Sequence, residues 1–421
     1  MEWKHICENG IRVMGIRNPH LHGFCASVYI LAGSMYEGEK ENGITHLMEH
    51  CVFRNLKKRV EGDFFELLTS HGLTVNACTY KEFVYFYVCG PTSGLPFAAE
   101  LLGKMFLPFD LTAEEYRTEL QRVKAEIREE AETTTLSHML NRHCWEGTTL
   151  ERTICGSCKC LDRISRKKLE EYRRRILVPG NMLVYLTGNI PDDARERIFG
   201  AVERIPTSAG PIRDNTAPVP QHFGQRPLTI HRKNADYCYL GASFDIDNTR
   251  ISAGIRDLLY SVLFEGENAL FYRHMSEEKA LVYSYDSTLE QYRNISRLKI
   301  EFEISRKDLL SAVRELIHVL HMVREGAFSF DNCLRKLLTR WELMLDAPGD
   351  LNWSMAYENH ILGAESIEPW AERLGRYAGI TRNDLMTAAR EIFHPGNLTV
   401  ALKGKNGTIP EEELLAIFAD L

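Results

Sequence analysis

The chain has 421 residues and a nearly balanced set of acidic and basic side chains, with a formal net charge of −7. This balance argues against nucleic acid as the main partner, and no apolar run approaches the length that would cross a membrane. The length suffices for two domains of about 200 residues, each with its own core.

The N-terminal residues Met1–Gly10 lack the apolar segment of a secretion signal. The chain contains 11 cysteines, an odd number, so a complete set of disulfides within one chain is impossible. Both observations favour a cytoplasmic protein with reduced thiols.

The stretch Gly43–Phe53 contains the pattern H-x-x-E-H, formed by His46, Glu49 and His50. Residues four apart on a helix share one face, so both imidazoles can reach one metal ion. Glu49 lies close enough to act on a bound water without ligating the metal. This arrangement is typical of metal-assisted hydrolysis, in inverted order. A short motif is a hypothesis only, because a helical histidine pair is also common on surfaces and in satisfied cores.

A strand is expected at Thr74–Thr79, after a turn at Gly72 and before the aromatic strand Phe83–Val88. Its position after the histidine helix suggests an edge of a sheet near that helix. The alternative for Asn76 is that it only closes a turn.

The spacing of apolar residues predicts a helix over Thr112–Ala131, with Thr112 as its N-cap. Catalytic zinc takes three protein ligands and leaves one position open, so a third ligand should come from a second helix. Glu119 and Glu126 are seven residues apart, beside the apolar stripe, and can point inward. The alternative is that both belong to a solvated, charge-rich face.

Cys155, Cys158 and Cys160 are close enough in the sequence to suggest a second metal site. A structural zinc or iron–sulfur site normally needs a fourth ligand, and no second cysteine pair follows at a usual spacing. We therefore expect a loop with free thiols, with metal binding or redox chemistry as the alternative. Cys51, next to His50, is expected to pack in the core.

A helix-turn-strand unit occurs twice, at a constant offset of 216 residues (from 165 to 381). Each copy has an N-capped helix, a Pro-Gly-Asn turn at Pro179–Asn181 or Pro395–Asn397, and an apolar strand. The repeat predicts two similar α+β halves, each a largely antiparallel sheet covered by helices.

Prolines and glycines mark a linker between the halves, and the expected domains are 1–205 and 229–421, with the linker at 206–228. The first is expected to be a zinc-binding catalytic domain. The second has no histidine pair near Tyr260–Gly266, where the repeat would place one, so it lacks this metal site.

Four segments in chain order, Ala32–Glu37, Asn42–Phe53, Asn76–Thr79 and Glu119–Glu126, resemble the successive landmarks of one enzyme family. This is the pitrilysin, or insulinase, family of inverted zinc metallopeptidases, in its processing-peptidase branch. The resemblance extends along essentially the whole chain. It implies a zinc ion held by His46, His50 and Glu126.

The resemblance also implies roles for residues around the metal. Glu119 matches an auxiliary acidic residue that supports the site without ligating zinc. The strand of Asn76, Ala77, Cys78 and Thr79 matches an edge that pairs with an extended substrate by β-augmentation.

In the second half, Ala269–Ser284 resembles the segment in which active family members supply an Arg and, seven residues later, a Tyr to the substrate and its developing oxyanion. Tyr283 is present, but Ser276 stands at the Arg position, which removes a fixed positive fork. The alternative for Tyr283 is an ordinary place in the core.

The resulting hypothesis is a zinc-dependent endopeptidase that hydrolyses peptides or flexible protein segments inside a chamber formed by a dimer. Glu49 would activate the zinc-bound water. The partner would be a sister subunit that supplies the Arg/Tyr pair, or a second copy of this chain. The rival hypothesis is a non-catalytic or weakly active partner subunit or scaffold of a peptidase complex.

Overall fold

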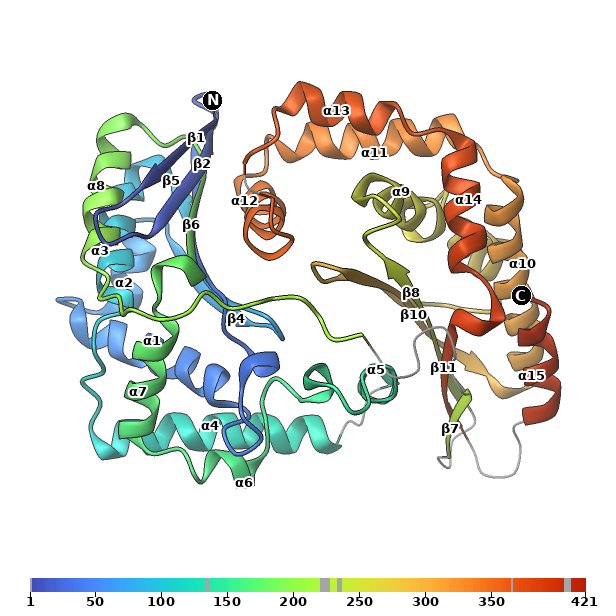
Figure 1. Cartoon of the computed structure of the whole chain (residues 1–421), viewed down its shortest axis with the longest axis horizontal. Coiled ribbons are helices and arrows are strands. Elements are labelled where there is room, and N and C mark those ends of the chain that lie inside the picture. The colour runs from blue at the N-terminus through green and yellow to red at the C-terminus, as the bar shows by residue number, and fades with distance from the viewer. Residues whose placement is uncertain (1, 133–135, 220–227, 233–236, 365, 405–409) are drawn as a thin grey trace. The chain divides into compact units, whose positions relative to one another are not determined.

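The computed structural model describes residues 2–132, 136–219, 228–232, 237–364, 366–404 and 410–421. The chain forms two compact units, each built on one sheet with helices against both faces (Figure 1). The expected α+β class with two similar halves is therefore confirmed.

The first unit comprises Met1–Thr133, Arg152–Asn215 and Glu342–Ile367. Its sheet has the strand order β1-β2-β6-β3-β5-β4, in which only the β2–β6 pair is parallel. The expected edge strand, β4, lies at one end of this order. The strands are β1 (Glu2–Ile6), β2 (Arg12–Arg17), β3 (Gly23–Ile30), β4 (Thr74–Thr79), β5 (Val84–Pro91) and β6 (Met182–Gly188).

One face of this sheet is covered by α1 (Ile44–Arg59), α3 (Leu95–Met105) and α8 (Asp192–Glu203), and α12 (Pro348–Ala356) packs on the other face (Figure 1). The unit also contains α2 (Phe64–Ser70), α4 (Ala113–Glu132), α6 (Cys158–Leu161), α7 (Arg166–Ile176), η1 (Ser34–Tyr36), η2 (Thr92–Gly94), η4 (Pro179–Asn181) and η7 (Tyr357–Ile361).

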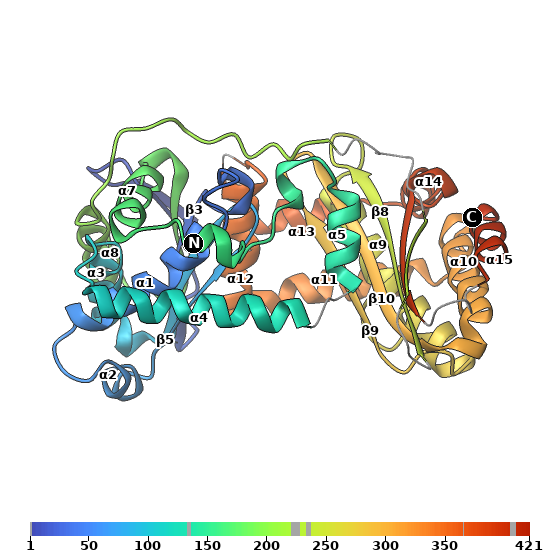
Figure 2. The ribbon, with the colours of Figure 1, turned by 90° about the horizontal axis from the view of Figure 1, so that it is seen from below.

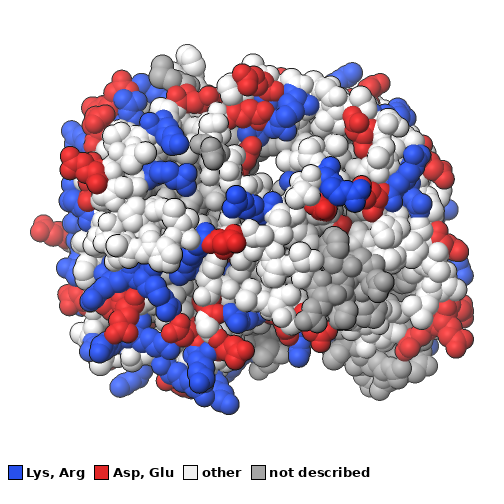
Figure 3. Space-filling view, in the orientation of Figure 1, with Lys and Arg blue, Asp and Glu red and all other residues white. Residues whose placement is uncertain are grey.

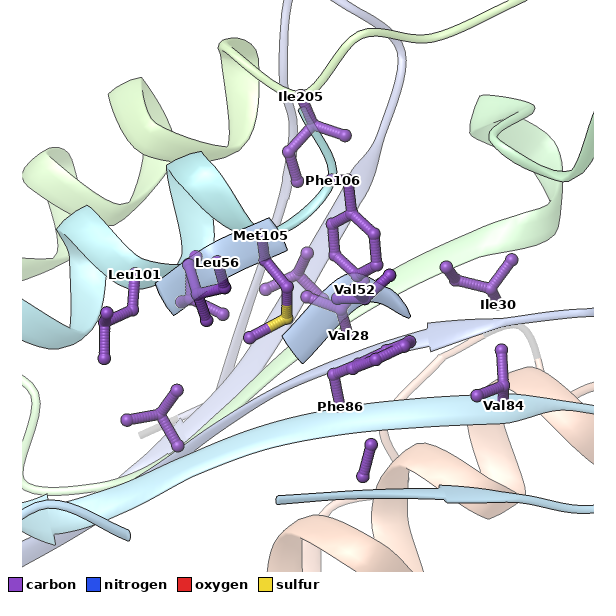
Figure 4. Packing of buried hydrophobic residues seen from close by; sticks show 14 of the residues in the cluster. Val28, Ile30, Val52, Leu56, Val84, Phe86, Leu101, Met105, Phe106 and Ile205 are labelled. Carbon is purple, nitrogen blue, oxygen red and sulfur yellow. The ribbon is translucent and has the colours of Figure 1, made fainter. Parts of the chain in front are cut away.

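The helix that carries the histidine pair is fixed by its apolar face. Val52 and Leu56 of α1 pack toward Val28 and Phe86 of the sheet (Figure 4), and all four side chains are buried. Each such side chain contributes about 1.5–3 kcal/mol when it is removed from water. Cys51 is fully buried in the same cluster, as expected. The hydrophobic core thus determines which face of α1 remains for chemistry.

The second unit comprises Thr134–Glu151, Thr216–Trp341 and Glu368–Leu421. Its sheet has the order β7-β11-β8-β10-β9, with only the β7–β11 pair parallel. The strands are β7 (Leu228–Arg232), β8 (Tyr237–Asp247), β9 (Tyr285–Gln291), β10 (Ile295–Ser305) and β11 (Leu398–Gly404).

Helices α10 (Leu309–Glu325) and α14 (Arg382–Ile392) cover one face of the second sheet, and α5 (Leu136–Cys144) packs on the other (Figure 1). The remaining elements are α9 (Ala253–Phe264), α11 (Phe330–Met344), α13 (Trp370–Ala378), α15 (Glu411–Ala419), η3 (Thr149–Glu151), η5 (Tyr272–Glu278), η6 (Arg306–Asp308) and η8 (Pro395–Asn397).

The repeated sequence unit folds in the same way in both halves. The first copy forms α7, η4 and β6, and the second forms α14, η8 and β11. Ser165 and Thr381 cap the two helices with their side chains. Strand β6 lies parallel to β2 and antiparallel to β3, as β11 does to β7 and β8. The two copies of the sequence repeat therefore have the same secondary structure and the same strand pairing in the two sheets.

Each sheet also takes a helix from the other half of the sequence. Helix α5 follows α4 in the chain but packs on β8 and β11, while α12 follows α11 but packs on β3 and β6. The domain limits expected from the sequence stay a prediction. Residues 206–219 contain no helix or strand, and 220–227 of the expected linker lie outside the described residues.

Lys and Arg are interspersed with Asp and Glu over the visible face, without a large region of one sign (Figure 3). Within the described ranges, no helix is both long and apolar enough to cross a lipid bilayer.

Candidate metal centre

The start of α1 is held by the buried carboxylate of Glu37. It accepts hydrogen bonds from the backbone N–H of Gly43 at 2.7 Å, and from the N–H and hydroxyl of Thr45 at 2.9 and 2.6 Å. A negative charge at this end complements the unsatisfied N–H groups and the dipole of the helix. Glu37 therefore fixes the orientation of the helix that presents both histidines.

The segment with the three clustered cysteines packs against this helix start, and Cys158 and Cys160 lie on the short helix α6 where a loop was expected. Asn42 donates a side-chain hydrogen bond to the Thr153 carbonyl at 2.8 Å, and the Cys160 thiol lies 3.3 Å from the Glu39 carbonyl. Cys155, Cys158 and Cys160 form no disulfide, and no group of three possible ligands among the described residues includes them. This segment thus has a packing role beside the start of α1.

His46, His50 and Glu126 come together where α1 and α4 lie side by side (Figure 2). The two Nε2 atoms are each 3.6 Å from a different Glu126 oxygen, and all three ligand atoms lie within 4.8 Å of one another. Ligands about 2.0–2.2 Å from a tetrahedral zinc ion are separated by about 3.4 Å. The donor set and its spacing therefore fit zinc.

Glu119 approaches the same centre from behind His50. Its side chain is only 3 % exposed, and one oxygen is 3.6 Å from His50 Nδ1. Arg54 donates to the other oxygen at 2.6 Å. The alternative of a solvated face is wrong for Glu119, because the side chain is buried; Glu126 is 43 % exposed.

The electrostatics of these groups follow from their contacts. Burial raises the pKa of Glu119, but hydrogen bonds from His50 and Arg54 and the charges of Arg54 and Arg122 lower it to about 2. Burial disfavours charge on His50, yet Glu119, Glu126 and Glu49 raise its pKa overall. A carboxylate behind the ring nitrogen orients the imidazole, as carboxylates do beside many metal-bound histidines.

His46 behaves differently from His50. Burial, with a smaller contribution from His50, lowers the pKa of His46 to about 4, so its ring is neutral at neutral pH. Its Nδ1 atom is buried and makes no hydrogen bond with the described residues. A neutral imidazole is the form that ligates a metal ion.

The side chain of Glu49 reaches from α1 to the edge strand β4. Thr79 of β4 donates its hydroxyl to Glu49 Oε2 at 2.6 Å. Burial raises the pKa of Glu49, with a further contribution from Glu126, while Thr79 and His50 oppose the shift. A carboxylate with a raised pKa is a stronger base than an ordinary glutamate.

Strand β4 is paired on one side only within the described sheet. Asn76 lies inside the strand, so the alternative that it closes a turn is wrong. Its side-chain oxygen accepts a hydrogen bond from the Ala77 N–H at 2.9 Å. Cys78 is exposed, and Ala77 is buried.

Tyr283 lies in the second unit, after η5, and its side chain is fully exposed. The alternative that it belongs to the core is therefore wrong. Ser276 lies within η5 and is half-buried.

The sequence patterns did not predict two contacts of the centre, the contact of Arg54 with Glu119 and the contact of Thr79 with Glu49. Arg54 follows His50 by four residues and so shares its helix face, which was a usable signal. The contact of Thr79 depends on the packing of β4 against α1, which no local pattern reveals.

Comparison with known proteins gives matches to two family models and to several relatives. The model of the insulinase family, peptidase family M16, matches residues 12–157, and that of the peptidase M16 inactive domain matches 163–336. An uncharacterized zinc protease of Bacillus subtilis, YmxG, is 25% identical over 305 residues, covering 70% of this chain and 72% of that protein. The mitochondrial-processing peptidase subunit beta of Rattus norvegicus is 33% identical over 172 residues, covering 39% of this chain and 34% of that protein.

Solved structures share the fold. A protease from Helicobacter pylori has a TM-score of 0.82 at 15% identity, covering 96% of this chain and 99% of that one. A putative M16-like peptidase from Alicyclobacillus acidocaldarius has a TM-score of 0.78 at 17% identity, covering 96% and 98%. The two matched models together span most of the sequence, and the chain belongs to the insulinase family of peptidases, family M16.

Proposed function

We propose that the protein is a zinc-dependent endopeptidase that hydrolyses peptides or flexible protein segments. The observation that carries this proposal is the convergence of His46, His50 and Glu126 within 4.8 Å, with Glu49 on the same helix as the histidines. Zinc held by these three residues would supply a Lewis acid that activates water and polarises the scissile carbonyl.

The chain's own residues supply the proton transfers. Glu49 takes the proton of the attacking water and passes it to the leaving amine. Thr79 holds one oxygen of Glu49 in place by its hydrogen bond of 2.6 Å. Glu119, itself anchored by Arg54, orients the ring of His50. Each residue thus has a separate role in one reaction.

The substrate would bind as an extended strand along Asn76, Ala77, Cys78 and Thr79. An edge strand offers main-chain hydrogen bonds with little demand on side chains. The Asn76 side chain covers the N–H of Ala77 and would have to release it when a substrate pairs there. Flexible segments suit this mode of binding, because only they can become extended without unfolding a domain.

The active assembly would be a dimer that encloses the substrate. Tyr283 is available at the surface of the second unit, but Ser276 lacks the positive charge of an Arg. A sister subunit that supplies both groups would complete the site, and a homodimer is the simpler arrangement. The similarity to subunits of a mitochondrial-processing peptidase supports such pairing and a role in peptide processing.

We place the protein in the cytoplasm because of its thiols. None of the eleven cysteines, all of which lie among the described residues, forms a disulfide, which suits a reducing compartment.

The second candidate is a non-catalytic or weakly active partner subunit. Ser276 favours it, as does the 26% identity over 185 residues to subunit 1 of the bovine cytochrome b-c1 complex. Such a subunit would keep the fold and the metal without turnover.

The deciding experiment compares Glu49→Gln with the wild type and with Glu114→Gln, an exposed carboxylate near the start of α4. Zinc content and cleavage of a peptide library are measured for all three, alone and in any complex isolated with the chain. We expect Glu49→Gln to keep its zinc and lose activity by several orders of magnitude, and Glu114→Gln to match the wild type. Undiminished activity in Glu49→Gln would refute the mechanism, and an inactive wild type in every assembly would favour the second candidate.

A further inference from the structure

A second cluster of ligating side chains lies in the second unit. His274, Glu315 and His318 offer ligand atoms that are all within 4.8 Å of one another. His274 Nδ1 is 3.1 Å from Glu315 Oε1 and 3.4 Å from Glu278 Oε2. The rings of His274 and His318 are nearly perpendicular, with centroids 5.6 Å apart.

The cluster joins two packed elements. His274 and Glu278 lie four residues apart on the π-helical segment η5, and Glu315 and His318 lie three apart on α10, so each pair shares a face. The side chains of His274 and Glu315 are only 13 % and 14 % exposed. These two side chains are largely shielded from water, whereas His318, the third member of the cluster, is exposed.

Two carboxylates converge on one ring nitrogen in this cluster. The oxygens of Glu278 and Glu315 both approach Nδ1 of His274, an atom that carries at most one N–H bond. Arg273 is 3.2 Å from the other oxygen of Glu278 and offsets part of its charge. A cation bound between the ring nitrogen and the two carboxylate oxygens would neutralise the rest of their negative charge.

We propose that this cluster is a second zinc site, with His274, Glu315 and His318 as ligands and Glu278 as a further carboxylate within reach. Two imidazole nitrogens and carboxylate oxygens are a typical donor set for zinc. The spacings of 3.1 and 3.4 Å are close to the distance of about 3.4 Å between neighbouring ligands of a tetrahedral ion.

An ion at this place would have a structural role. It would tie η5 to α10, and η5 in turn anchors the chain that follows: the Met275 carbonyl accepts hydrogen bonds from the N–H groups of Leu281 and Val282 at 2.8 and 3.1 Å. The next residue is Tyr283. The ion would thus hold the segment that presents Tyr283, and only this consequence rests on the proposed function.

The test counts zinc ions in the full-length chain. The protein is stripped with a chelator, incubated with zinc and desalted, and its metal content is measured for four forms: wild type, His46→Ala/His50→Ala, His274→Ala/His318→Ala, and all four changes together. We expect two, one, one and no equivalents. His321→Ala is the matched control, because His321 lies on α10 but contacts the Asp420 carbonyl instead, and it should keep two.

A second measurement covers variants that fold poorly. In the His46→Ala/His50→Ala background, zinc should raise the melting temperature, since a ligand that binds only the folded state stabilises it. Adding Glu315→Gln should weaken zinc binding at least about a hundredfold, because loss of a partner that merely supports a ligand already costs 10–100-fold. One equivalent in the wild type, with none left in His46→Ala/His50→Ala, would overturn the inference and leave the proposed peptidase centre intact.

Discussion

The buried His360 should make the first unit sensitive to acid. It lies in η7, where its Nδ1 accepts a hydrogen bond from Arg12 Nη2 at 3.3 Å and its Nε2 donates to the Asn181 carbonyl at 3.1 Å. These two partners require the neutral ring with its proton on Nε2. Burial, and then the charge of Arg12, lower the pKa of His360 to about 3 despite the bond to Asn181.

The sign of the effect follows from linkage. The ordinary pKa of 6.5 applies to the unfolded chain, which therefore binds a proton that the folded chain excludes between about pH 6.5 and pH 3. The stabilising contribution of neutral His360 is complete above this window and decreases as the pH falls through it. At 1.36 kcal/mol for each pKa unit, the free energy of unfolding should fall by about 2 kcal/mol on going to pH 5.

The assay compares the wild type with His360→Gln, whose amide can still donate to Asn181 but does not titrate. Urea unfolding at about pH 7.5, 6 and 5 gives the free energy of unfolding of each form. The difference between the two forms should shrink by about 2 kcal/mol over this range, and contributions from all other groups cancel. His22→Gln, at an exposed histidine, is the control and should follow the wild type.

Identical pH profiles for wild type and His360→Gln would refute this reasoning. They would mean that the ring is protonated in the folded protein, or that η7 does not stay docked on the sheet in solution.

Two further changes probe the metal centre, and a third probes the second unit. Gly43→Ala should lower the free energy of unfolding by at least about 2 kcal/mol in urea titrations, because Gly43 has φ 96° and an added Cβ would clash with a neighbouring backbone carbonyl. A change of less than about 0.5 kcal/mol would contradict this. Thr79→Val removes the hydroxyl that donates to Glu49 and keeps nearly the same side-chain volume, so kcat should fall about 10–100-fold while the zinc content stays the same. An unchanged kcat would show that Thr79 does not position the base. Ser276→Arg should raise the peptidase rate of the isolated chain by up to about a hundredfold, and it should have little effect in a complex with a sister subunit that supplies the Arg. If the isolated wild-type chain already cleaves peptides rapidly and Ser276→Arg does not change its rate, the heterodimer loses its support.

Local pattern alone was enough for much of this protein. The helix of His46 and His50 follows from helical spacing, and the pair can meet one metal ion only because residues four apart share a face. The repeat ending in β6 and β11 was visible because both copies keep the same N-cap and Pro-Gly-Asn turn. Such features involve residues that are close in the sequence.

Tertiary structure decided the rest. Helices α5 and α12 each leave the half in which they occur in the sequence and pack on the other sheet, because an amphipathic helix specifies that it must be covered but not by which partner. The contact of Thr79 with Glu49 and the cluster of His274 with Glu315 join residues 30 and 41 positions apart on different elements. Their meeting depends on how these elements pack, and the spacing of residues within either element carries no information about that.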